Sequence, residues 1–333
     1  ADRALAIAEE LDLPIVRQHA LNMRGLRRAN GGDPGGIDDL RAALALAMDQ
    51  LATRAAQAAY VNLSWALNSQ DPLAALDAAD AGVTFDRSRG APRSQSGPIR
   101  QWPLLALGRW DEVLDAGAEM VRLAEPLGDR WTIRYAGAPM AIVLAFRGRP
   151  EASLELARMA TDDAYETTGL FALAGVVAHR TLGNMAEAEQ SLSDAVATWV
   201  DGDDRYHGCD VARETVFLDR LDQLERLLAL PRRTMTSAAR ARTTWLAIAA
   251  EAGGRGADAL ELYREAAAGW LSFGDPYEQA HALLGCGRIL DGLHRGTEAV
   301  GPLQEARAIF ERLGAAPGLA VTDAFLSHAI GHG

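Results

Sequence analysis

The sequence contains no lysine, and all 33 of its basic residues are arginine. This absence excludes a phosphate-binding loop of the Walker A type, the strand lysine of protein kinases and the Schiff-base lysine of pyridoxal-phosphate enzymes. Only two cysteines occur, Cys209 and Cys286, so we expect neither a disulfide framework nor a zinc site of CxxC type. Such sparse cysteine fits a reducing compartment, and a cytoplasmic location is expected.

Long apolar runs are also missing. The longest, residues 136–146, has 11 residues and contains Pro139, whereas a membrane-spanning helix needs about 20, so no membrane contact is expected. The formal net charge is -12, and an acidic chain repels the phosphate backbone. We therefore expect no direct nucleic-acid partner. Residues 1–14 predict a charged amphipathic helix rather than a secretion signal, and the missing initiator methionine suggests a piece of a longer protein.

Alanine and leucine dominate what is present. The chain has 65 alanines and 44 leucines against 39 valine, isoleucine and threonine residues combined. Alanine and leucine favour helices, whereas β-branched residues favour strands. The composition therefore predicts an all-α fold.

One pattern recurs along the chain: a helical stretch, a short turn with glycine or a polar pair, and a small residue that opens a second amphipathic helix. The first apolar residues of the second helices, called anchors here, are spaced by 35 to 40 residues, and the degenerate middle unit supplies one of them: Ile37, Ala74, Val113, Ala152, Ala188, Leu224, Ala259 and Ala299. Such spacing is typical of repeat proteins built from helix pairs. We expect one right-handed superhelix, an α-solenoid, over residues 1–333, with a partial helix at 1–14, about eight repeats at 18–315 and a capping helix at 318–330.

Small residues also recur seven positions after some anchors, two helical turns later. Ala188 with Ala195 and Ala259 with Ala266 are examples, and small side chains on one face let paired helices approach closely. We therefore expect the anchors to be buried where two helices cross.

The anchor pattern resembles that of tetratricopeptide repeats, most clearly at Gly287, Arg288, Ala299 and Ala306. The segments LGRWDE (Leu107–Glu112), DPYEQAHALLGCGRIL (Asp275–Leu290) and EARAIFERLGAAP (Glu305–Pro317) are similar to the C-terminal helical-repeat regions of large bacterial signalling ATPases. That group includes LuxR-type transcriptional regulators and cyclase–ATPase fusions. The Walker A lysine of their ATPase module is absent, and no helix-turn-helix follows the repeats before the chain stops at residue 333.

The resemblance implies a non-enzymatic sensor or scaffold within a cytoplasmic signalling or transcription-regulating protein. Its partner would be a protein segment or a small effector, and no cofactor is expected. The alternative is a free-standing enzyme or ligand-modifying protein built on a helical solenoid. An enclosed pocket with convergent polar groups would favour the alternative, and an open groove would favour the sensor.

If the first helix of each pair lines the concave surface, the repeat phase directs a set of side chains into the groove. These groove candidates are Trp102, Arg134, Arg180, Tyr206, Arg213, Glu251, His281 and Arg288. A row of arginines on one wall would favour an anionic or carboxylate-bearing effector. Ion pairs between these arginines and acidic residues of neighbouring repeats are the alternative.

Other residues suggest chemistry only weakly. Glu278 and His281 form the only E-x-x-H motif, whereas a carboxylate-bridged metal pair needs two, so we expect a solvated helix start. The acidic segment from Asp201 to Asp210 fails the spacing of a calcium loop, and we expect Asp210 to cap the next helix. We expect no metal site and no catalytic residues. Residues 88–100 are followed by Trp102 and Pro103, and Pro98 and Pro103 rule out a regular helix there. We expect a kinked repeat with a solvated basic face, and a distorted helix or long loop with a functional role is the alternative.

Overall fold

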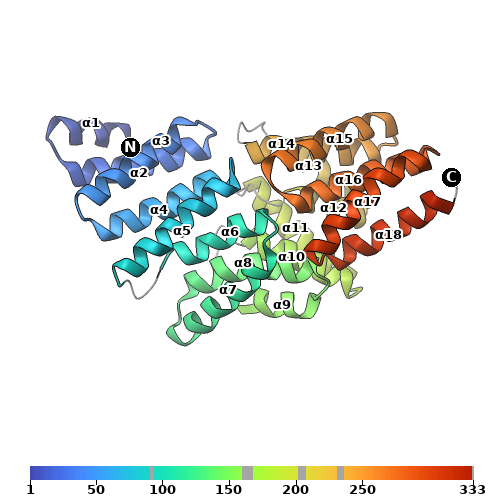
Figure 1. Cartoon of the computed structure of the whole chain (residues 1–333), viewed down its shortest axis with the longest axis horizontal. Helices are drawn as coiled ribbons and strands as arrows, with labels where there is room; N and C mark the ends of the chain where they lie inside the picture. Colours follow the sequence, from blue (N-terminus) through green and yellow to red (C-terminus); the bar gives the residue numbers. More distant parts are fainter. Residues whose placement is uncertain (91–93, 160–167, 202–207, 231–235, 332–333) are drawn as a thin grey trace. The chain divides into compact units, whose positions relative to one another are not determined.

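The structure, a computed structural model, describes residues 1–90, 94–159, 168–201, 208–230 and 236–331. Within these ranges the chain forms eighteen α-helices, one short 3-10 helix, η1 (Glu125–Leu127), and no β-strand (Figure 1). This confirms the all-α fold expected from the excess of alanine and leucine. None of the helices in the same ranges combines the length and the apolar character needed to cross a membrane.

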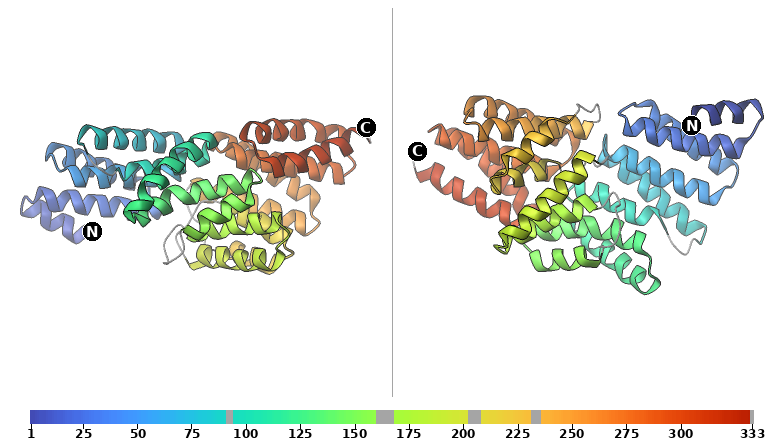
Figure 2. Two further views of the ribbon diagram at one scale, coloured as in Figure 1. Left: turned by 90° about the horizontal axis from the view of Figure 1, so that it is seen from below. Right: turned by 180° about the vertical axis from the view of Figure 1, so that it is seen from behind.

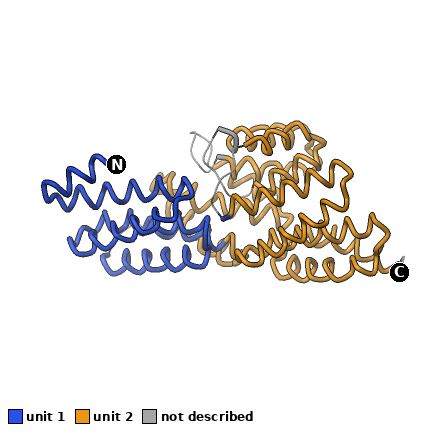
Figure 3. Tube along the Cα trace, turned by 90° about the horizontal axis from the view of Figure 1, so that it is seen from above, with its two compact units in different colours: residues 1–104, 233–236 blue, residues 105–232, 237–333 orange. Residues whose placement is uncertain are grey.

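The chain divides into two compact units, shown in different colours in Figure 3. Unit 1 comprises residues 1–104 and 233–236. Its helices α2 to α5 pack against one another in sequence order, as Figures 1 and 2 show. The helices of unit 1 are α1 (Asp2–Glu10), α2 (Pro14–Asn30), α3 (Gly35–Asp49), α4 (Thr53–Asn68), α5 (Pro72–Ser88) and most of α6 (Ser96–Ala106).

Unit 2 comprises residues 105–232 and 237–333 and holds the remaining helices. Its most extensive helix contacts join α16 to α17, α10 to α11 and α15 to α16. The helices are α7 (Trp110–Ala124), α8 (Arg130–Phe146), α9 (Pro150–Met159), α10 (Thr168–Thr181), α11 (Met185–Asp201), α12 (Gly208–Phe217), α13 (Leu221–Leu228), α14 (Thr236–Ala252), α15 (Gly256–Phe273), α16 (Pro276–Gly292), α17 (Gly296–Leu313) and α18 (Ala316–Gly331).

The helices expected at the two ends of the chain correspond to α1 and α18. Helix α1 ends at Glu10 rather than at residue 14, and α18 begins at Ala316 rather than at residue 318. The single array expected over residues 1–333 stays a prediction, because the structure describes two units.

The eight anchors all lie in the first four residues of the odd-numbered helices from α3 to α17. Ala188, Ala259 and Ala299 are fully buried, and so are the alanines seven positions further on. In α5 and α9 the register differs by one residue, because Ala75 and Ser153 are buried while the anchors Ala74 and Ala152 are only half-buried. The buried position is the fourth residue of each of these two helices, so the helix start sets the register.

The prolines around residue 100 do not prevent a helix. Helix α6 runs over Ser96–Ala106 and contains Pro103, so these residues form a helix with an internal proline and not a long loop. Pro98 lies in the first turn, where the backbone N–H group would have no helical partner in any case. Residues 91–93 of the same stretch lie outside the described residues.

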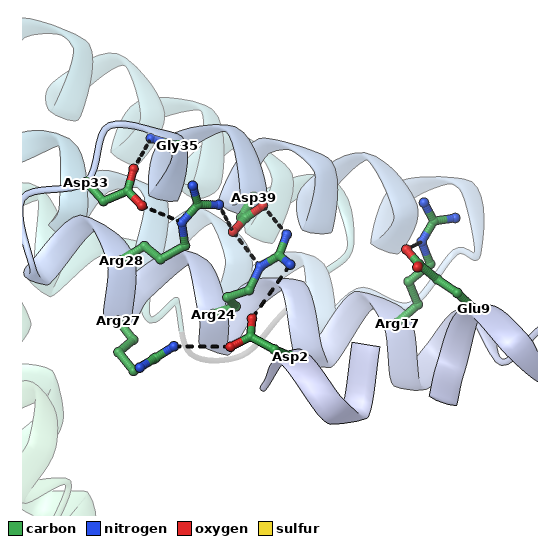
Figure 4. A network of polar contacts seen from close by, with 9 residues as sticks. All are labelled: Asp2, Glu9, Arg17, Arg24, Arg27, Arg28, Asp33, Gly35 and Asp39. Carbon is green, nitrogen blue, oxygen red and sulfur yellow. Dashed lines mark hydrogen bonds and ion pairs between the residues drawn. The ribbon is translucent and has the colours of Figure 1, made fainter. Parts of the chain in front are cut away.

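A network of ion pairs ties the first three helices of unit 1 together (Figure 4). Asp39 of α3 accepts hydrogen bonds from Arg24 and Arg28 of α2, with N–O distances of 2.6 to 2.8 Å. Arg24 also lies 3.8 Å from Asp2 of α1, and Arg28 donates to Asp33 in the turn before α3. These arginines hold the pKa of the Asp39 carboxyl below its usual value, Arg24 contributing most. Asp39 therefore stays ionised at neutral pH and fixes α2 against α3.

Helices α2 and α3 approach so closely that only glycine fits at their crossing. A Cβ atom on Gly36 would lie 2.3 Å from the backbone nitrogen of Ala29 and 2.6 Å from the carbonyl oxygen of Gly25. Both neighbours are backbone atoms, which no rotamer change can move away. The crossing therefore depends on the missing side chain of Gly36.

Unit 2 brings its early helices into contact with its last ones. The Arg147 guanidinium, just after α8, donates through Nε to the Leu313 carbonyl at the end of α17, at 3.0 Å. The Tyr277 ring of α16 stacks on Phe146 of α8, with ring centroids 4.4 Å apart. Helix α18 also contacts α8 directly. The helices of unit 2 therefore close around an interior.

Replacement of Gly36 by alanine tests the close crossing of α2 and α3. We expect Gly36→Ala to lower the free energy of unfolding by about 1–3 kcal/mol, because the new methyl group overlaps the backbone of α2. The matched control is Gly301→Ala in α17, where a Cβ atom would meet nothing within 4 Å. There the gain in helix propensity should leave stability unchanged or raise it by up to about 1 kcal/mol. Urea denaturation measures both, and equal effects would contradict the crossing.

Candidate functional site

Unit 2 contains a partly open cavity of about 340 Å³. Its wall comes from the even-numbered helices α8 to α18, with one residue, Tyr263, from α15. Much of the wall is apolar and aromatic: Phe146, Val177, Val216, Phe217, Ile248, Leu284, Pro317 and Val321. A volume of this size, mostly apolar walls and a few polar groups are typical of small-molecule sites.

The first charged group of the wall is a pair between α10 and α12. Arg180 donates two hydrogen bonds to Glu214, from Nε at 2.6 Å and from a terminal nitrogen at 2.9 Å. The Arg180 guanidinium also lies over the Phe217 ring, 4.7 Å from its centroid. Burial of Glu214 raises the pKa of its carboxyl, and Arg180 opposes that shift. The pair therefore fixes the distance between two helices that face the cavity.

The second charged group joins α12 to α16. Arg213 donates to both oxygens of Glu278, at 2.8 and 2.7 Å, and to Asp210 one turn earlier in its own helix. The exposed fractions of the three side chains are only 13%, 6% and 4%. A charge buried this deeply must be paired, because isolated it would cost several kcal/mol. Arg213 therefore sets the position of α16 relative to α12.

The third charged group lies between α14, α15 and α16. Arg288 donates to both oxygens of Glu251, at 2.5 and 2.6 Å. The Tyr263 hydroxyl donates to the same carboxylate at 2.7 Å. Burial raises the pKa of the Tyr263 hydroxyl, so the phenol stays protonated. Glu251 accepts three hydrogen bonds and is held in one orientation.

Aromatic rings form the part of the wall next to these pairs. Tyr277 contacts the His281 ring edge-on at 4.6 Å, and His281 contacts Phe310 in the same way at 4.9 Å. The Nε2 atom of His281 is buried and has no hydrogen-bond partner among the described residues. Burial, together with the nearby arginines, lowers the pKa of His281 well below its ordinary value. The imidazole is therefore neutral at physiological pH.

The charges of the cavity nearly cancel. Among the described residues, Arg180, Arg213 and Arg288 face Asp210, Glu214 and Glu251 in the wall, and Glu278 lies behind Arg213. Three cations thus meet four carboxylates. The row of arginines expected to attract an anion is paired internally, as the alternative had it, because buried guanidinium groups require counter-charges.

Five of the eight groove candidates converge on this one cavity: Arg180, Arg213, Glu251, His281 and Arg288. Arg134 is buried in α8 and is not part of the described wall. Trp102 is buried in α6 of unit 1, where its ring lies 5.1 Å from that of Trp65. Tyr206 lies outside the described residues.

Two expectations about acidic residues are wrong. Glu278 is buried on Arg213 and His281 lines the cavity, so they do not form a solvated helix start. Asp210 is the third residue of α12 and pairs with Arg213 instead of capping the helix. In both cases the carboxylate pairs with Arg213. The repeat pattern did not show that this arginine is buried. Within the described residues no group of histidine, cysteine and acidic side chains is arranged to hold a metal ion.

Sequence reasoning missed Glu214, Tyr263 and Tyr277, although a signal for two of the ion pairs was present. Arg180 and Glu214 are 34 residues apart, and Glu251 and Arg288 are 37 apart, close to one repeat length. Opposite charges at such separations occupy similar positions on successive first helices. Arg213 and Glu278 are 65 residues apart, and their pairing depends on how unit 2 closes.

Comparison with known proteins adds no assignment. The sequence matches no protein-family model, and a search of curated proteins finds no match. The geometry of the cavity is therefore the basis of any functional proposal.

A double-mutant cycle tests the buried pair of α12 and α16. Glu278→Leu should lower the free energy of unfolding by about 3–5 kcal/mol, because it removes the main counter-charge of a buried guanidinium. The double variant Arg213→Met/Glu278→Leu should lose clearly less than the sum of the single variants. The same substitutions at the exposed pair Arg295 and Glu298 are the control and should show a coupling of no more than about 1 kcal/mol. Additive effects at Arg213 and Glu278 would contradict the pairing.

The pH dependence of stability tests the neutral state of His281. A histidine whose folded pKa is depressed contributes stability that is present above its ordinary value of 6.5 and lost as the pH falls. His281→Gln should therefore lose about 1 kcal/mol less than the wild type between pH 6.5 and 5.5. Glu214 has the opposite sign, since its raised pKa gives stability that is lost as pH rises, but it is present in both proteins. The control His19→Gln changes an exposed residue, and parallel curves for wild type and His281→Gln would contradict the prediction.

Proposed function

We propose that the chain is a right-handed α-solenoid of tetratricopeptide-like helix pairs and that unit 2 is a non-enzymatic, effector-binding sensor region. The effector is a small molecule bound in the cavity. The parent protein would be a cytoplasmic signalling or transcription-regulating protein. The observation that carries this proposal is the cavity of about 340 Å³, whose walls combine apolar side chains with ion pairs held in fixed orientations.

The solenoid part of the proposal is supported by the anchors. All eight open the odd-numbered helices, and the cavity is lined almost entirely by even-numbered helices. One helix of each pair thus supplies small residues for close packing, while the other faces the interior. This division of roles is that expected for helix-pair repeats whose concave side binds a ligand.

The sensor part is supported by how the ion pairs connect the helices. They link α10 with α12, α12 with α16 and α14 with α16. A ligand that contacts these side chains changes contacts shared by several helices at once. Such contacts let a small molecule alter the relative stability of two arrangements of the unit, which is what a sensor requires.

The alternative, an enzyme, retains one specific observation in its favour. The cavity is lined by convergent polar groups, and Glu214 and His281 have shifted pKa values, as catalytic groups often do. Structural ion pairs shift pKa values as well, and here both oxygens of Glu214 and of Glu251 are held by arginine. Cys209 is buried, and its thiol pKa is raised by burial, so it is a poor nucleophile. Binding is therefore favoured over catalysis.

A thermal-shift screen with a chemically diverse collection of small molecules tests the proposal. Compounds that bind the cavity at about 100 times their Kd should add about 2.7 kcal/mol of stability. Ile248→Phe, which places a larger ring in the cavity wall, should abolish these shifts. Leu246→Phe, at an exposed position of the same helix, is the control and should preserve them.

The outcomes separate the two functions. Compounds that stabilise the wild type and Leu246→Phe but not Ile248→Phe support a ligand site in the cavity. Equal shifts in both variants, or no shifts at all, contradict it. Chromatography of the bound compounds after incubation distinguishes a sensor, which releases them unchanged, from an enzyme, which releases products.

A further inference from the structure

Helix α1 of unit 1 presents an apolar stripe to solvent. Its buried residue Leu5 packs in a cluster with residues of α2 and α3 and so holds the helix in place. Ala4, Ile7 and Leu11 are three and four residues apart, so they share another face of the helix, and all three are exposed. The exposed fractions are 42% for Ile7 and 59% for Leu11. This face therefore has no partner among the described residues.

The exposed apolar surface continues past the end of α1. Leu13 in the turn is 39% exposed, and at the start of α2 Ile15 is 73% and Val16 is 42% exposed. With Ile7 and Leu11, these side chains bring a group of large apolar residues into solvent within one short stretch of the chain. Exposed apolar surface that gathers in one place is typical of an interaction site.

The charged residues of α1 fall into two groups. Asp2 and Glu9 form ion pairs with arginines of α2, as Figure 4 shows. Arg3 and Glu10 are exposed, and their side chains have no partner within the part of the chain that the structure describes. They are seven residues apart, which is two helical turns, so they lie on one side of the helix next to the apolar stripe.

These positions are complementary to themselves when two copies of α1 lie antiparallel. If Ile7 faces Ile7 of the partner subunit, opposing residues lie equally far before and after Ile7, within one residue. Ala4 then faces Leu11 of the partner subunit, a small side chain against a large one. Arg3 faces Glu10 of the partner subunit in the same way. Two-fold symmetry repeats each contact, so the interface holds two such ion pairs.

We propose that α1 is the contact surface of a homodimer, in which a second copy of the chain binds antiparallel to the first across the stripe of Ala4, Ile7 and Leu11. A second copy is the partner that supplies the apolar residues and the opposite charges in one register. Because the helix is short and a net charge of -12 repels another copy, the dimer is weak, with a Kd of about 10 μM. The interface lies in unit 1, so this inference and the ligand site of unit 2 fail independently.

Sedimentation velocity of the full chain over about 1 to 100 μM tests the dimer. Ile7→Glu puts a charge in the apolar stripe and should raise the Kd at least about tenfold. Leu73→Glu introduces the same charge at a position of α5 that is 62% exposed, and it should leave the Kd within about twofold. A wild type that stays monomeric at all these concentrations, or an equal Kd for Ile7→Glu and the wild type, overturns the inference.

Charge reversals test the antiparallel register. Arg3→Glu and Glu10→Arg each place like charges opposite one another at both ion pairs, so each should raise the Kd about tenfold. Both changes stabilise α1 itself, because an acidic residue near the N-terminus and a basic one near the C-terminus complement the helix dipole. A weaker dimer in these variants therefore does not arise from fraying of α1.

The net charge of the chain predicts a different outcome for one of these variants. Glu10→Arg makes the chain less negative, so repulsion between whole chains alone would give a stronger dimer. Glu261→Arg makes the same change of charge at an exposed position of α15 and should not weaken the dimer. Equal Kd values for Glu10→Arg and Glu261→Arg would overturn the inference.

A mixture of the two reversed variants gives the sharpest result. A chain with Arg3→Glu and a chain with Glu10→Arg meet with opposite charges at both ion pairs, so they should form a heterodimer with a Kd within about threefold of the wild type. The double variant Arg3→Glu/Glu10→Arg should dimerise with itself equally well. Fluorescence-detected sedimentation with one labelled variant measures the heterodimer. A mixture that associates no better than either variant alone overturns the inference.

Discussion

The pairing of three buried arginines with carboxylates is the constraint on which the interior of unit 2 depends. Arg180, Arg213 and Arg288 each hold a carboxylate from another helix through two hydrogen bonds. Neither partner can be buried alone without a cost of several kcal/mol, so the helices that carry them must stay at the distance that the pairs require. The helices therefore cannot collapse onto one another, and a cavity remains between them.

The closure of unit 2 complements this constraint. The Phe146–Tyr277 stack and the hydrogen bond from Arg147 to the Leu313 carbonyl join the early helices of the unit to its last ones. Without these contacts α16 would be placed only by its sequence neighbours, and Glu278 would not be required to meet Arg213. Closure and charge pairing thus depend on each other. The cavity wall contains the Phe146–Tyr277 stack as well as residues of the ion pairs, so a ligand in the cavity would contact both groups of residues.

The sequence was sufficient for the helical class and for the approximate starts of the odd-numbered helices from α3 to α17. The apolar anchors recur at 35 to 40 positions, and all eight open odd-numbered helices. The register failed by one residue in α5 and α9, because spacing alone does not say at which residue a helix starts. Pro98 does not prevent α6, since it lies in the first turn, where a proline costs little, whereas Pro103 lies inside the helix.

The cavity was accessible to sequence reasoning only in part. Repeat phase directed Arg180, Arg213, Glu251, His281 and Arg288 to the same side of the even-numbered helices, and all five line the cavity. The same reasoning could not tell which carboxylates would face these arginines. The partner of Arg213 lies 65 residues away and is brought there by closure, which is a property of the whole unit and not of one repeat. The ion pairs that the arginines form with these carboxylates were therefore not predicted residue by residue.

A crystal structure of the full chain grown with a compound that stabilises it in the thermal-shift screen tests the central claim, that the ion-paired cavity of unit 2 is a ligand site, most directly. The account predicts electron density for the compound against Phe146, Tyr277 and Ile248. The arginine–carboxylate pairs should remain intact around it. Density at another site, with the cavity occupied by the protein's own side chains, would contradict the account.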